Sequence, residues 1–329
     1  MQYAKLGNTG IEVSVFALGC WPFAGGAVWG AQDDNVSIAT AHAALDAGIN
    51  FFDTAEGYEN GHSEEVLGRA LVGRRDEAVI ATKVSANHLA AADLLAACAA
   101  SLKRLQTDYI DLYQVHWTNW NVPLAETIGA LQKLKQQGKV RAFAVCNFGV
   151  RDMNDWLQIA PLITNQLPLS LLWRGIERGI QQNCVKHGIG LICYSPLAQG
   201  LLTGRYASAD DVPDGLSRSR WYASSRKLAR HGEPGCEAQV FTAVQAVRKI
   251  AADLGKPMAH VALAWVRQQP NVTALLIGAR SPQELQQDLP FLDLTLSPAT
   301  IGKLSAATAP VKEKLGDNPD MWMVPSRLR

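Results

Sequence analysis

The sequence predicts an α/β protein, a closed (β/α)8 TIM barrel, and three observations support this fold class. Eight apolar, β-rich runs recur along the chain, alternating with longer segments of helical periodicity. The runs are almost continuously apolar, which is typical of parallel strands buried on both faces. The length of 329 residues suits one such barrel, so we expect a single domain over residues 1–329.

The predicted strands follow one another in a regular order. A short opening segment with a turn at Gly7–Gly10 predicts a β-hairpin ahead of the barrel. The eight strands are predicted at 15–19, 49–54, 78–83, 109–116, 140–146, 162–167, 189–195 and 273–279. Their number favours closure into a barrel.

Helix candidates lie between the strands. In SEEVLGRALVG, Ser63 is the expected N-cap, and Val66 and Ala70 belong to a shared apolar face. Further candidates are AADLLAACAASLKRL, PLAETIGALQKLKQQG and PQELQQDL. Gly138 is expected to end the second of these, because glycine readily adopts the left-handed conformation that stops a helix.

Two segments depart from this alternation. Residues 207–235, after the seventh strand, form a long polar stretch rich in Gly, Pro and Ser without a sustained period. A loop of that length in a compact domain is typically either a functional lid or disordered, and both interpretations stay open here. The C-terminal tail, LGDNPDMWMVPSRLR, is similarly irregular, and we expect it to cross one end of the barrel.

Composition and charge exclude several classes of function. The 31 basic and 30 acidic side chains give no electrostatic footprint for nucleic acid or an anionic membrane, so a small-molecule ligand is expected. No apolar run approaches a membrane span, and the N-terminus lacks a signal-peptide pattern. The six cysteines form no C-x-x-C pair, which favours reduced thiols and a cytoplasmic location. Nothing in the pattern indicates a particular oligomeric state.

Common nucleotide and metal motifs are absent from the sequence. No G-x-G-x-x-G follows a strand and no Walker-type loop occurs, so a Rossmann-type dinucleotide site is not expected. The seven histidines show no metal-ligand spacing such as H-E-x-x-H. We therefore expect no metal site.

Four polar residues are predicted to meet at the mouth of the barrel. Asp53, Lys83 and His116 end the second, third and fourth strands, and active sites of this fold lie at the carboxyl ends of the strands. Tyr58 follows Asp53 closely enough for the loop to turn back over the mouth. One such residue alone is more often solvated or structural, whereas four with compatible roles indicate a catalytic group.

These four side chains suit proton donation to a developing alkoxide. Tyrosine has a reference pKa of about 10, and an adjacent ammonium lowers that pKa by stabilising the phenolate. Lys83 can supply the ammonium, and the Asp53 carboxylate keeps it protonated when both are buried. His116 can donate a hydrogen bond to a carbonyl and hold it beside Tyr58.

Several motifs in the right order extend this prediction along the chain. They are FFDTAEGY, ATKV, LYQVHW, GKVRAFAVCNF, NQL, YSPLAQGLLTGRY and IGARSPQEL. On these residues the chain resembles an aldo-keto reductase over essentially its full length. The resemblance implies hydride transfer from a nicotinamide cofactor to an aldehyde or ketone. It also implies Tyr58 as the acid, with Asp53, Lys83 and His116 in support.

The loops after the seventh and eighth strands are expected to bind the cofactor. In barrels these loops often form phosphate sites, and here they supply glycines together with Arg205 and Arg280. The resemblance implies that Ser195, Leu197 and Arg205 hold the pyrophosphate.

The nicotinamide is expected nearer the mouth. The resemblance implies that Tyr194 stacks on its ring and that Asn147 and Gln166 bind its carboxamide. The full expected cofactor set is Trp21, Asn147, Gln166, Tyr194, Ser195, Leu197, Gly200, Arg205, Gly278, Arg280, Glu284, Gln287 and Asp288.

The helix after the eighth strand bears on the choice of cofactor. Glu284, Gln287 and Asp288 stand where the family usually has Gln, Glu and Asn, and an acid near the adenosine ribose disfavours a 2′-phosphate. Arg280 acts in the opposite sense, because a guanidinium pairs well with phosphate. We expect NADPH, with NADH as the alternative.

Tryptophans are expected to shape the substrate pocket. Trp29 and Trp117 follow the first and fourth strands, and Trp221 lies in the long loop. Tryptophan offers large apolar faces and one hydrogen-bond donor, which suits stacking against a sugar ring or another compact carbonyl compound, so a carbohydrate-type carbonyl is among the candidate substrates. These three are the candidate substrate residues.

Two other functions stay open at this point. One is a nicotinamide-binding regulatory subunit of a membrane channel, because some barrels similar to this family associate with channels and a fold does not fix a function. Negligible turnover and co-purification with a membrane partner would favour it. The other is a lyase or isomerase on the same barrel, which a requirement for reduced cofactor would exclude.

Overall fold

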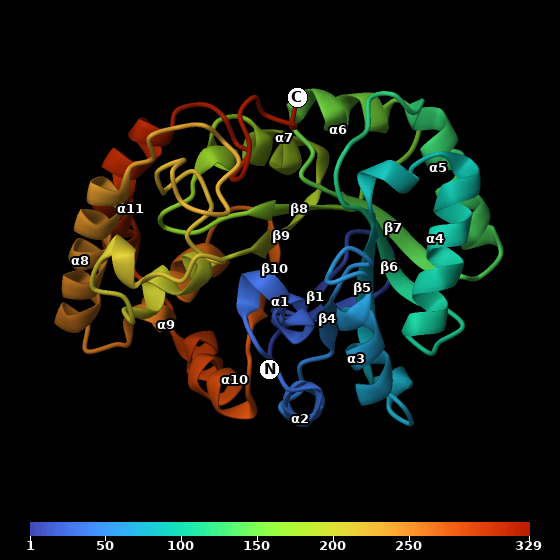
Figure 1. Ribbon diagram of the computed structural model, residues 1–329, viewed down its shortest axis with the longest axis horizontal. Helices are drawn as coiled ribbons and strands as arrows, with labels where there is room; N and C mark the ends of the chain where they lie inside the picture. Colours follow the sequence, from blue (N-terminus) through green and yellow to red (C-terminus); the bar gives the residue numbers. More distant parts are fainter.

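A computed structural model describes residues 1–329, and its centre is a closed barrel of eight parallel strands (Figure 1). The strands are β3 (Phe16–Gly19), β4 (Phe51–Asp53), β5 (Val79–Val84), β6 (Ile110–Val115), β7 (Val140–Cys146), β8 (Thr164–Pro168), β9 (Gly190–Tyr194) and β10 (Val272–Gly278). Neighbours in this order pair with each other, and β10 closes the ring on β3. The predicted barrel is confirmed, and each strand ends within two residues of its predicted limits.

The predicted hairpin closes the amino-terminal end of the barrel. Strands β1 (Tyr3–Lys5) and β2 (Glu12–Ser14) are antiparallel. Leu6, Ile11 and Val13 are buried and pack in one cluster with inward-facing side chains of the barrel strands. The interior is therefore filled from this end, and the opposite end, where the strands finish, is left for a site.

An outer layer of helices surrounds the strands (Figure 1). The α-helices are α1 (Gly26–Trp29), α2 (Asp34–Asp46), α3 (His62–Ala70), α4 (Ala91–Arg104), α5 (Leu124–Gln136), α6 (Val150–Leu157), α7 (Ile180–His187), α8 (Glu237–Asp253), α9 (Met258–Arg267), α10 (Pro282–Asp288) and α11 (Pro298–Leu315). Short 3₁₀ helices are η1 (Trp21–Ala24), η2 (Arg75–Glu77), η3 (Ala86–His88), η4 (Gly175–Glu177), η5 (Ala198–Thr203), η6 (Ala209–Asp211) and η7 (Leu289–Asp293).

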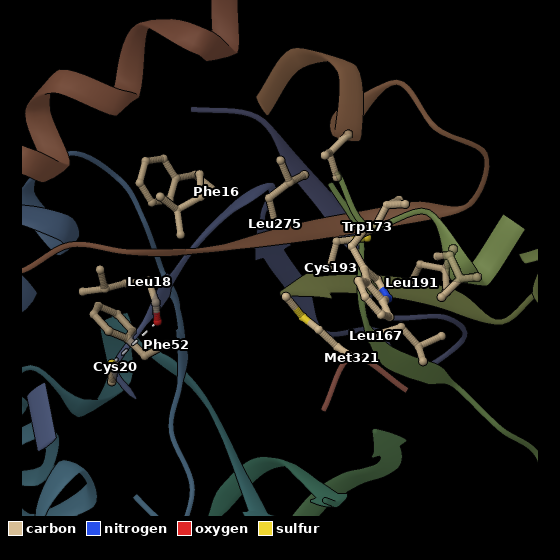
Figure 2. Close-up of a cluster of buried hydrophobic side chains, with 14 of the residues drawn as sticks. Phe16, Leu18, Cys20, Phe52, Leu167, Trp173, Leu191, Cys193, Leu275 and Met321 are labelled. Atoms are coloured by element: carbon tan, nitrogen blue, oxygen red, sulfur yellow. Dashed lines mark hydrogen bonds between the residues drawn. The ribbon is translucent and has the colours of Figure 1, made fainter. Parts of the chain in front are cut away.

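The main apolar core lies between the strands and this helical layer. Figure 2 shows part of it: Phe16, Leu18 and Leu275 come from β3 and β10, and Met321 comes from the C-terminal tail. All four side chains are fully buried. The tail is thus packed into the core of the protein.

One helix boundary differs from the prediction. Ser63 lies inside α3, which begins at His62 after Gly61, a residue with φ of 93°. The Ser63 hydroxyl donates to the carbonyl of Cys20 (2.7 Å) and accepts from the Thr54 hydroxyl (2.9 Å). Ser63 is therefore not the N-cap, because its hydroxyl binds the segments that follow β3 and β4. Gly138 does follow the end of α5, with φ of 72°.

The long loop and the tail pack against each other at the carboxyl end of the barrel. In the loop 207–235, Arg220 is buried, its backbone N–H donates to the carbonyl of Met321 (3.1 Å), and its side chain donates to the carbonyl of Asn318 (2.8 Å). The tail continues across this end, where the Arg327 guanidinium lies 3.4 Å from the ring centre of Trp117. The predicted crossing of the barrel end is confirmed.

Candidate active site

A cavity of about 840 Å³ opens at the carboxyl ends of the strands. Its wall includes all but two of the residues that the sequence singled out. The lining members of that set are Trp21, Trp29, Asp53, Tyr58, His116, Trp117, Asn147, Gln166, Tyr194, Ser195, Leu197, Gly200, Arg205, Gly278, Arg280, Glu284, Gln287 and Asp288. The two that do not line it are Lys83 and Trp221.

Lys83 lies just beneath the cavity wall and contacts two of the lining residues. Its side chain is 0% exposed, and its ammonium donates to Asp53 Oδ1 (2.6 Å), to the carbonyl of Thr54 (2.7 Å) and to the Tyr58 hydroxyl (3.0 Å). Tyr58 reaches this position because its backbone N–H donates to the carbonyl of Ala55 (3.1 Å), which turns the loop back after β4. The sequence placed these groups together correctly.

Burial and charge act in opposite senses on this group. Burial is the largest single influence on Lys83 and lowers its pKa, but Asp53, Tyr58 and Cys146 together outweigh burial and hold that pKa above its ordinary value. For Tyr58, burial is the larger influence and raises the pKa to about 12, although Lys83 opposes it. The predicted net lowering of the Tyr58 pKa is therefore wrong, because desolvation of the phenolate costs more than the nearby ammonium returns. Both groups are protonated at neutral pH.

His116 directly follows β6 and faces Tyr58. The two rings meet edge to face with centres 5.9 Å apart. Burial lowers the pKa of His116 well below its ordinary value, and the charges of Lys83 and Arg327 lower it further. His116 is consequently a neutral imidazole at pH 7, able to donate one hydrogen bond into the cavity.

Polar side chains around this group are held in place by one another. Gln166 Nε2 donates to Asp53 Oδ2 (2.7 Å), so its amide supports the carboxylate that faces Lys83. The Tyr194 hydroxyl donates to Asn147 Oδ1 (3.0 Å), and Asn147 Nδ2 donates to the backbone carbonyl of His116 (3.1 Å). Asn147 has a left-handed backbone, with φ of 57°, a conformation that is uncommon outside glycine and is found at functional sites.

The loop after β9 forms one long wall of the cavity. Ser195 and Gln199 have φ of 53° and 55°, which brings backbone and side chains close to the open space. The Gln199 amide is 8% exposed and neither its oxygen nor its nitrogen has a hydrogen-bond partner. A buried amide without partners is unusual and indicates a ligand that completes it.

Helix α10 and Arg280, which lies two residues before it, form another part of the same wall. The Arg280 backbone N–H donates to Glu284 Oε2 (2.9 Å), and its guanidinium donates to the side chain of Gln32 (2.9 Å). Burial raises the pKa of Asp288 to about 6, Glu284 adds to the rise, and Arg205 opposes it. The wall therefore combines two acidic groups with two cations.

The predicted tryptophans divide into two groups. Trp29 and Trp117 line the cavity. Trp221 is 0% exposed, packs edge to face on Trp173 at 5.9 Å, and donates its indole N–H to the carbonyl of Leu172 (3.0 Å). The prediction of a substrate contact for Trp221 is therefore wrong, because the loop carries this indole into the hydrophobic core, away from the cavity.

Comparison with known proteins identifies the family. The sequence model of the Aldo/keto reductase family matches residues 16–309. The chain belongs to the aldo/keto reductase family. The match begins at β3 and runs through the barrel to α11, so it covers every strand that positions the site.

Curated members similar to this chain have several different names. Aldo-keto reductase YhdN of Bacillus subtilis (strain 168) is 36% identical over 301 residues, or 87% of each chain. NADH-specific methylglyoxal reductase of Escherichia coli (strain K12) is 32% identical and covers 91% of this chain and 96% of its own. A probable voltage-gated potassium channel subunit beta of Arabidopsis thaliana is 30% identical and covers 92% of this chain and 95% of its own.

Solved structures of aldo/keto reductases and a related dehydrogenase superimpose on this barrel. The glycerol dehydrogenase AKR11B4 from Gluconobacter oxydans matches with a TM-score of 0.79, 31% identity and 97% coverage of both chains. An aldo-keto reductase from Klebsiella pneumoniae in complex with NADPH matches with a TM-score of 0.74, 29% identity, and coverage of 93% of this chain and 95% of its own. In this chain, no helix combines the length and apolar character needed to cross a membrane.

Among the lining residues of this aldo/keto reductase cavity that the sequence did not single out, three polar side chains bear on ligand binding: Gln199, Arg218 and Arg230. Gln199 lies within the YSPLAQGLLTGRY motif, between predicted residues Leu197 and Gly200, and that position was the available signal. Arg218 and Arg230 come from the loop 207–235, where no periodicity indicates which side chains face inward.

Proposed function

We propose that the protein reduces an aldehyde or ketone to an alcohol, with Tyr58 as the proton donor and a reduced nicotinamide as the hydride source. The observation that carries this proposal is the bridging position of Lys83, 2.6 Å from Asp53 Oδ1 and 3.0 Å from the Tyr58 hydroxyl. The buried carboxylate keeps the ammonium charged, and the ammonium stabilises the phenolate that proton donation would leave. Membership of the aldo/keto reductase family supports the same reaction.

The proposed reduction adds a hydride and a proton to the carbonyl group of the substrate. When bound, the reduced nicotinamide supplies a hydride, with its two electrons, to the carbonyl carbon. The Tyr58 hydroxyl gives its proton to the carbonyl oxygen as negative charge develops there, so that C=O becomes CH–OH. Neutral His116 donates a hydrogen bond to the same oxygen and orients it. Tyr58 then regains a proton from solvent.

The residues of the long wall fit a dinucleotide. The cavity volume lies within the range of about 300–1,000 Å³ that is usual for small-molecule and cofactor sites. The unpartnered Gln199 amide supports a polar ligand there, and Arg205 and Arg280 supply cations for phosphate. Ser195, Leu197 and the backbone near Gly200 would hold the pyrophosphate.

We propose NADPH as the cofactor, with NADH as the alternative. Similar proteins support both, since they include an NADPH complex and an NADH-specific reductase. The names methylglyoxal reductase and glycerol dehydrogenase support a small carbonyl substrate. The six free, buried cysteines support the cytoplasm as the compartment.

The test is oxidation of NADPH and NADH, followed by absorbance, with a panel of simple aldehydes, ketones and oxidised sugars. Tyr58→Phe should lower kcat by about 10²- to 10⁴-fold, the usual contribution of a positioned acid. Its affinity for cofactor, measured by fluorescence titration, should stay the same. Tyr3→Phe is the matched control, because Tyr3 is exposed on β1 and its hydroxyl donates to Gly48 outside the cavity. Full activity in Tyr58→Phe would reject the assignment.

A second function, regulation of a membrane channel, is supported by the similarity to the channel subunit beta of Arabidopsis thaliana. The same panel separates the two. Tight cofactor binding with no turnover of any carbonyl compound, together with capture of a membrane partner, would favour the regulatory role.

A further inference from the structure

Two arginines of the loop 207–235 line the cavity without a carboxylate partner. Arg218 and Arg230 both face the open space, and neither forms an ion pair. Two other arginines of the same loop behave differently, because Arg220 and Arg226 each pair with a carboxylate, at 2.7 Å and 2.9 Å. Unpaired positive charge in this loop is therefore confined to the side chains that face the cavity.

Arg218 is held in a fixed position by aromatic rings. Its guanidinium carbon lies 5.2 Å from the ring centre of Trp21 and 4.4 Å from that of Trp322. Its Nε donates to the carbonyl of Gly215 (3.0 Å), and its two terminal nitrogens have no protein acceptor. Burial lowers the pKa of Arg218 to about 10, and repulsion from Arg230 adds to the fall. Arg218 is still a cation at neutral pH, with unused donors.

One indole, that of Trp21, contacts both this cation and the proposed proton donor. The Trp21 ring that contacts Arg218 also stacks on the Tyr58 ring, with centres 5.4 Å apart. Trp29 meets the same indole edge to face at 5.6 Å, and its own Nε1 has no hydrogen-bond acceptor. The Trp21 ring thus contacts Tyr58 and also two side chains, Arg218 and Trp29, that have N–H groups without a hydrogen-bond acceptor.

No free carboxylate balances these donors in this part of the cavity. Among the lining residues, Asp53 is occupied by Lys83. Glu284 and Asp288 belong to α10, on the wall that we assign to the cofactor. In the part of the cavity between Trp21 and the loop 207–235, unpaired positive charge is therefore not matched by a free carboxylate.

We propose that the carbonyl substrate carries an anionic group, a carboxylate or a phosphate, that binds Arg218 and Arg230. Guanidinium groups bind both kinds of oxygen anion with short, charge-assisted hydrogen bonds. The indoles of Trp21, Trp29 and Trp322 would enclose the body of the substrate between this anion and the carbonyl. The inference rests on the proposed reductase function, whose substrate class it narrows.

The experiment compares substrates that differ in charge and little in shape. One pair is 4-carboxybenzaldehyde and its methyl ester, and the other is glyceraldehyde 3-phosphate and glyceraldehyde. For the wild type, kcat/KM should be about 10- to 100-fold higher for the charged member of at least one pair. In Arg218→Gln this ratio should collapse towards one, while kcat/KM for the neutral member and the cofactor affinity change less than about threefold.

Three further variants separate charge from structure. Arg218→Lys keeps the charge but loses the planar donor geometry, so it should keep part of the preference. Arg230→Gln should lower the preference less than Arg218→Gln, because Arg230 is exposed and its charge is screened. Lys227→Gln removes an exposed charge of the same loop that does not line the cavity, and it should leave the preference unchanged.

The results of these experiments distinguish a failure of the anion site from a failure of the reductase function. Equal kcat/KM for charged and neutral partners in the wild type would overturn the inference and leave the reductase function intact. A loss of cofactor affinity in Arg218→Gln with no change in the ratio would show that this guanidinium serves the cofactor phosphates instead. If no aldehyde is reduced, the reductase proposal fails. Calorimetry with the alcohol 4-(hydroxymethyl)benzoate then tests the anion site by itself. We expect the wild type to bind this compound and Arg218→Gln not to bind it. No binding to the wild type would refute the anion site.

Discussion

Replacing Lys83 by methionine tests the central contact of the site. The ammonium of Lys83 is fully buried and is 2.6 Å from a carboxylate that is only 2% exposed. Methionine has a similar volume, so Lys83→Met removes the charge and leaves little cavity. Its main effect is to leave the Asp53 carboxylate buried without a counter-charge, since only amide donors of Gln114 and Gln166 then face it.

The size of the effect follows from that desolvation. Breaking a buried ion pair by removing one partner typically costs about 3–5 kcal/mol. With an unfolding entropy of about 2.1 cal/mol/K per residue, that loss lowers the Tm by about 4–7 °C for this chain. The rate falls as well, because the phenolate of Tyr58 loses its nearest cation, and we expect kcat to decrease by about 10²- to 10⁴-fold.

The assay is a double-mutant cycle read by calorimetry and by turnover. Lys83→Met, Asp53→Asn and the combined variant are compared, with Lys133→Met on the exposed face of α5 as the control for loss of a lysine charge. The combined variant contains no buried charge at this position, so it should recover most of the lost stability but none of the activity. A combined variant as unstable as the sum of the two single variants would refute the ion-pair argument, and an active Lys83→Met would refute the catalytic one.

Two other predictions concern cofactor choice and helix packing. Because the folded-state pKa of Asp288, about 6, is raised above its ordinary 3.8, the contribution of Asp288 to stability is complete below about pH 4 and is lost as the pH rises through about 6. Asp288→Asn should therefore stabilise the fold by about 3 kcal/mol at about pH 8 and by little at about pH 4, and it should raise kcat/KM for NADPH relative to NADH. A difference in unfolding free energy between variant and wild type that is the same at both pH values would contradict this prediction. Gly68→Ala should destabilise the protein by about 1–3 kcal/mol, because an added Cβ would lie 2.5 Å from the carbonyl oxygen of Arg104. Gly129 lies on the open face of α5, where an added Cβ would have no atom within 4 Å, so Gly129→Ala should stabilise the protein by about 0.5–1 kcal/mol. Chemical denaturation that ranks the stabilities of the two variants in the opposite order would reject the packing argument.

The barrel and its polar mouth were predictable because both depend on local patterns. Strands buried on two faces appear in the sequence as apolar runs such as VIATKV, and the last residue of each run lies at the carboxyl end of the barrel. Asp53 and Lys83 needed only this regularity, and Tyr58 needed in addition a short turn after its strand. The pairing of these three groups therefore follows from strand order and spacing.

Long-range packing and energetic balance were not predictable in the same way. Trp221 and Arg218 are three residues apart in an aperiodic loop, and only the folded chain shows that the first is core and the second lines the cavity. The direction of the Tyr58 pKa shift depends on how far burial exceeds the attraction of Lys83, a difference between two large effects. Ser63 satisfied the N-cap pattern, yet its hydroxyl binds the segments after two neighbouring strands.

The site divides its tasks between parts of the fold that differ in rigidity. The proposed proton donor Tyr58 and the Lys83 ammonium are held by β4, β5 and the turn between β4 and α3, and β4 and β5 belong to the closed barrel. The cations proposed to select the substrate belong to a loop that packs on the tail through Arg220. Since Trp21 is the ring that contacts both Tyr58 and Arg218, changes in the loop can alter the substrate range while the contact between Lys83 and Tyr58 stays in place. If the proposed reductase function holds, the same reaction would serve different substrates through changes in the loop and tail alone.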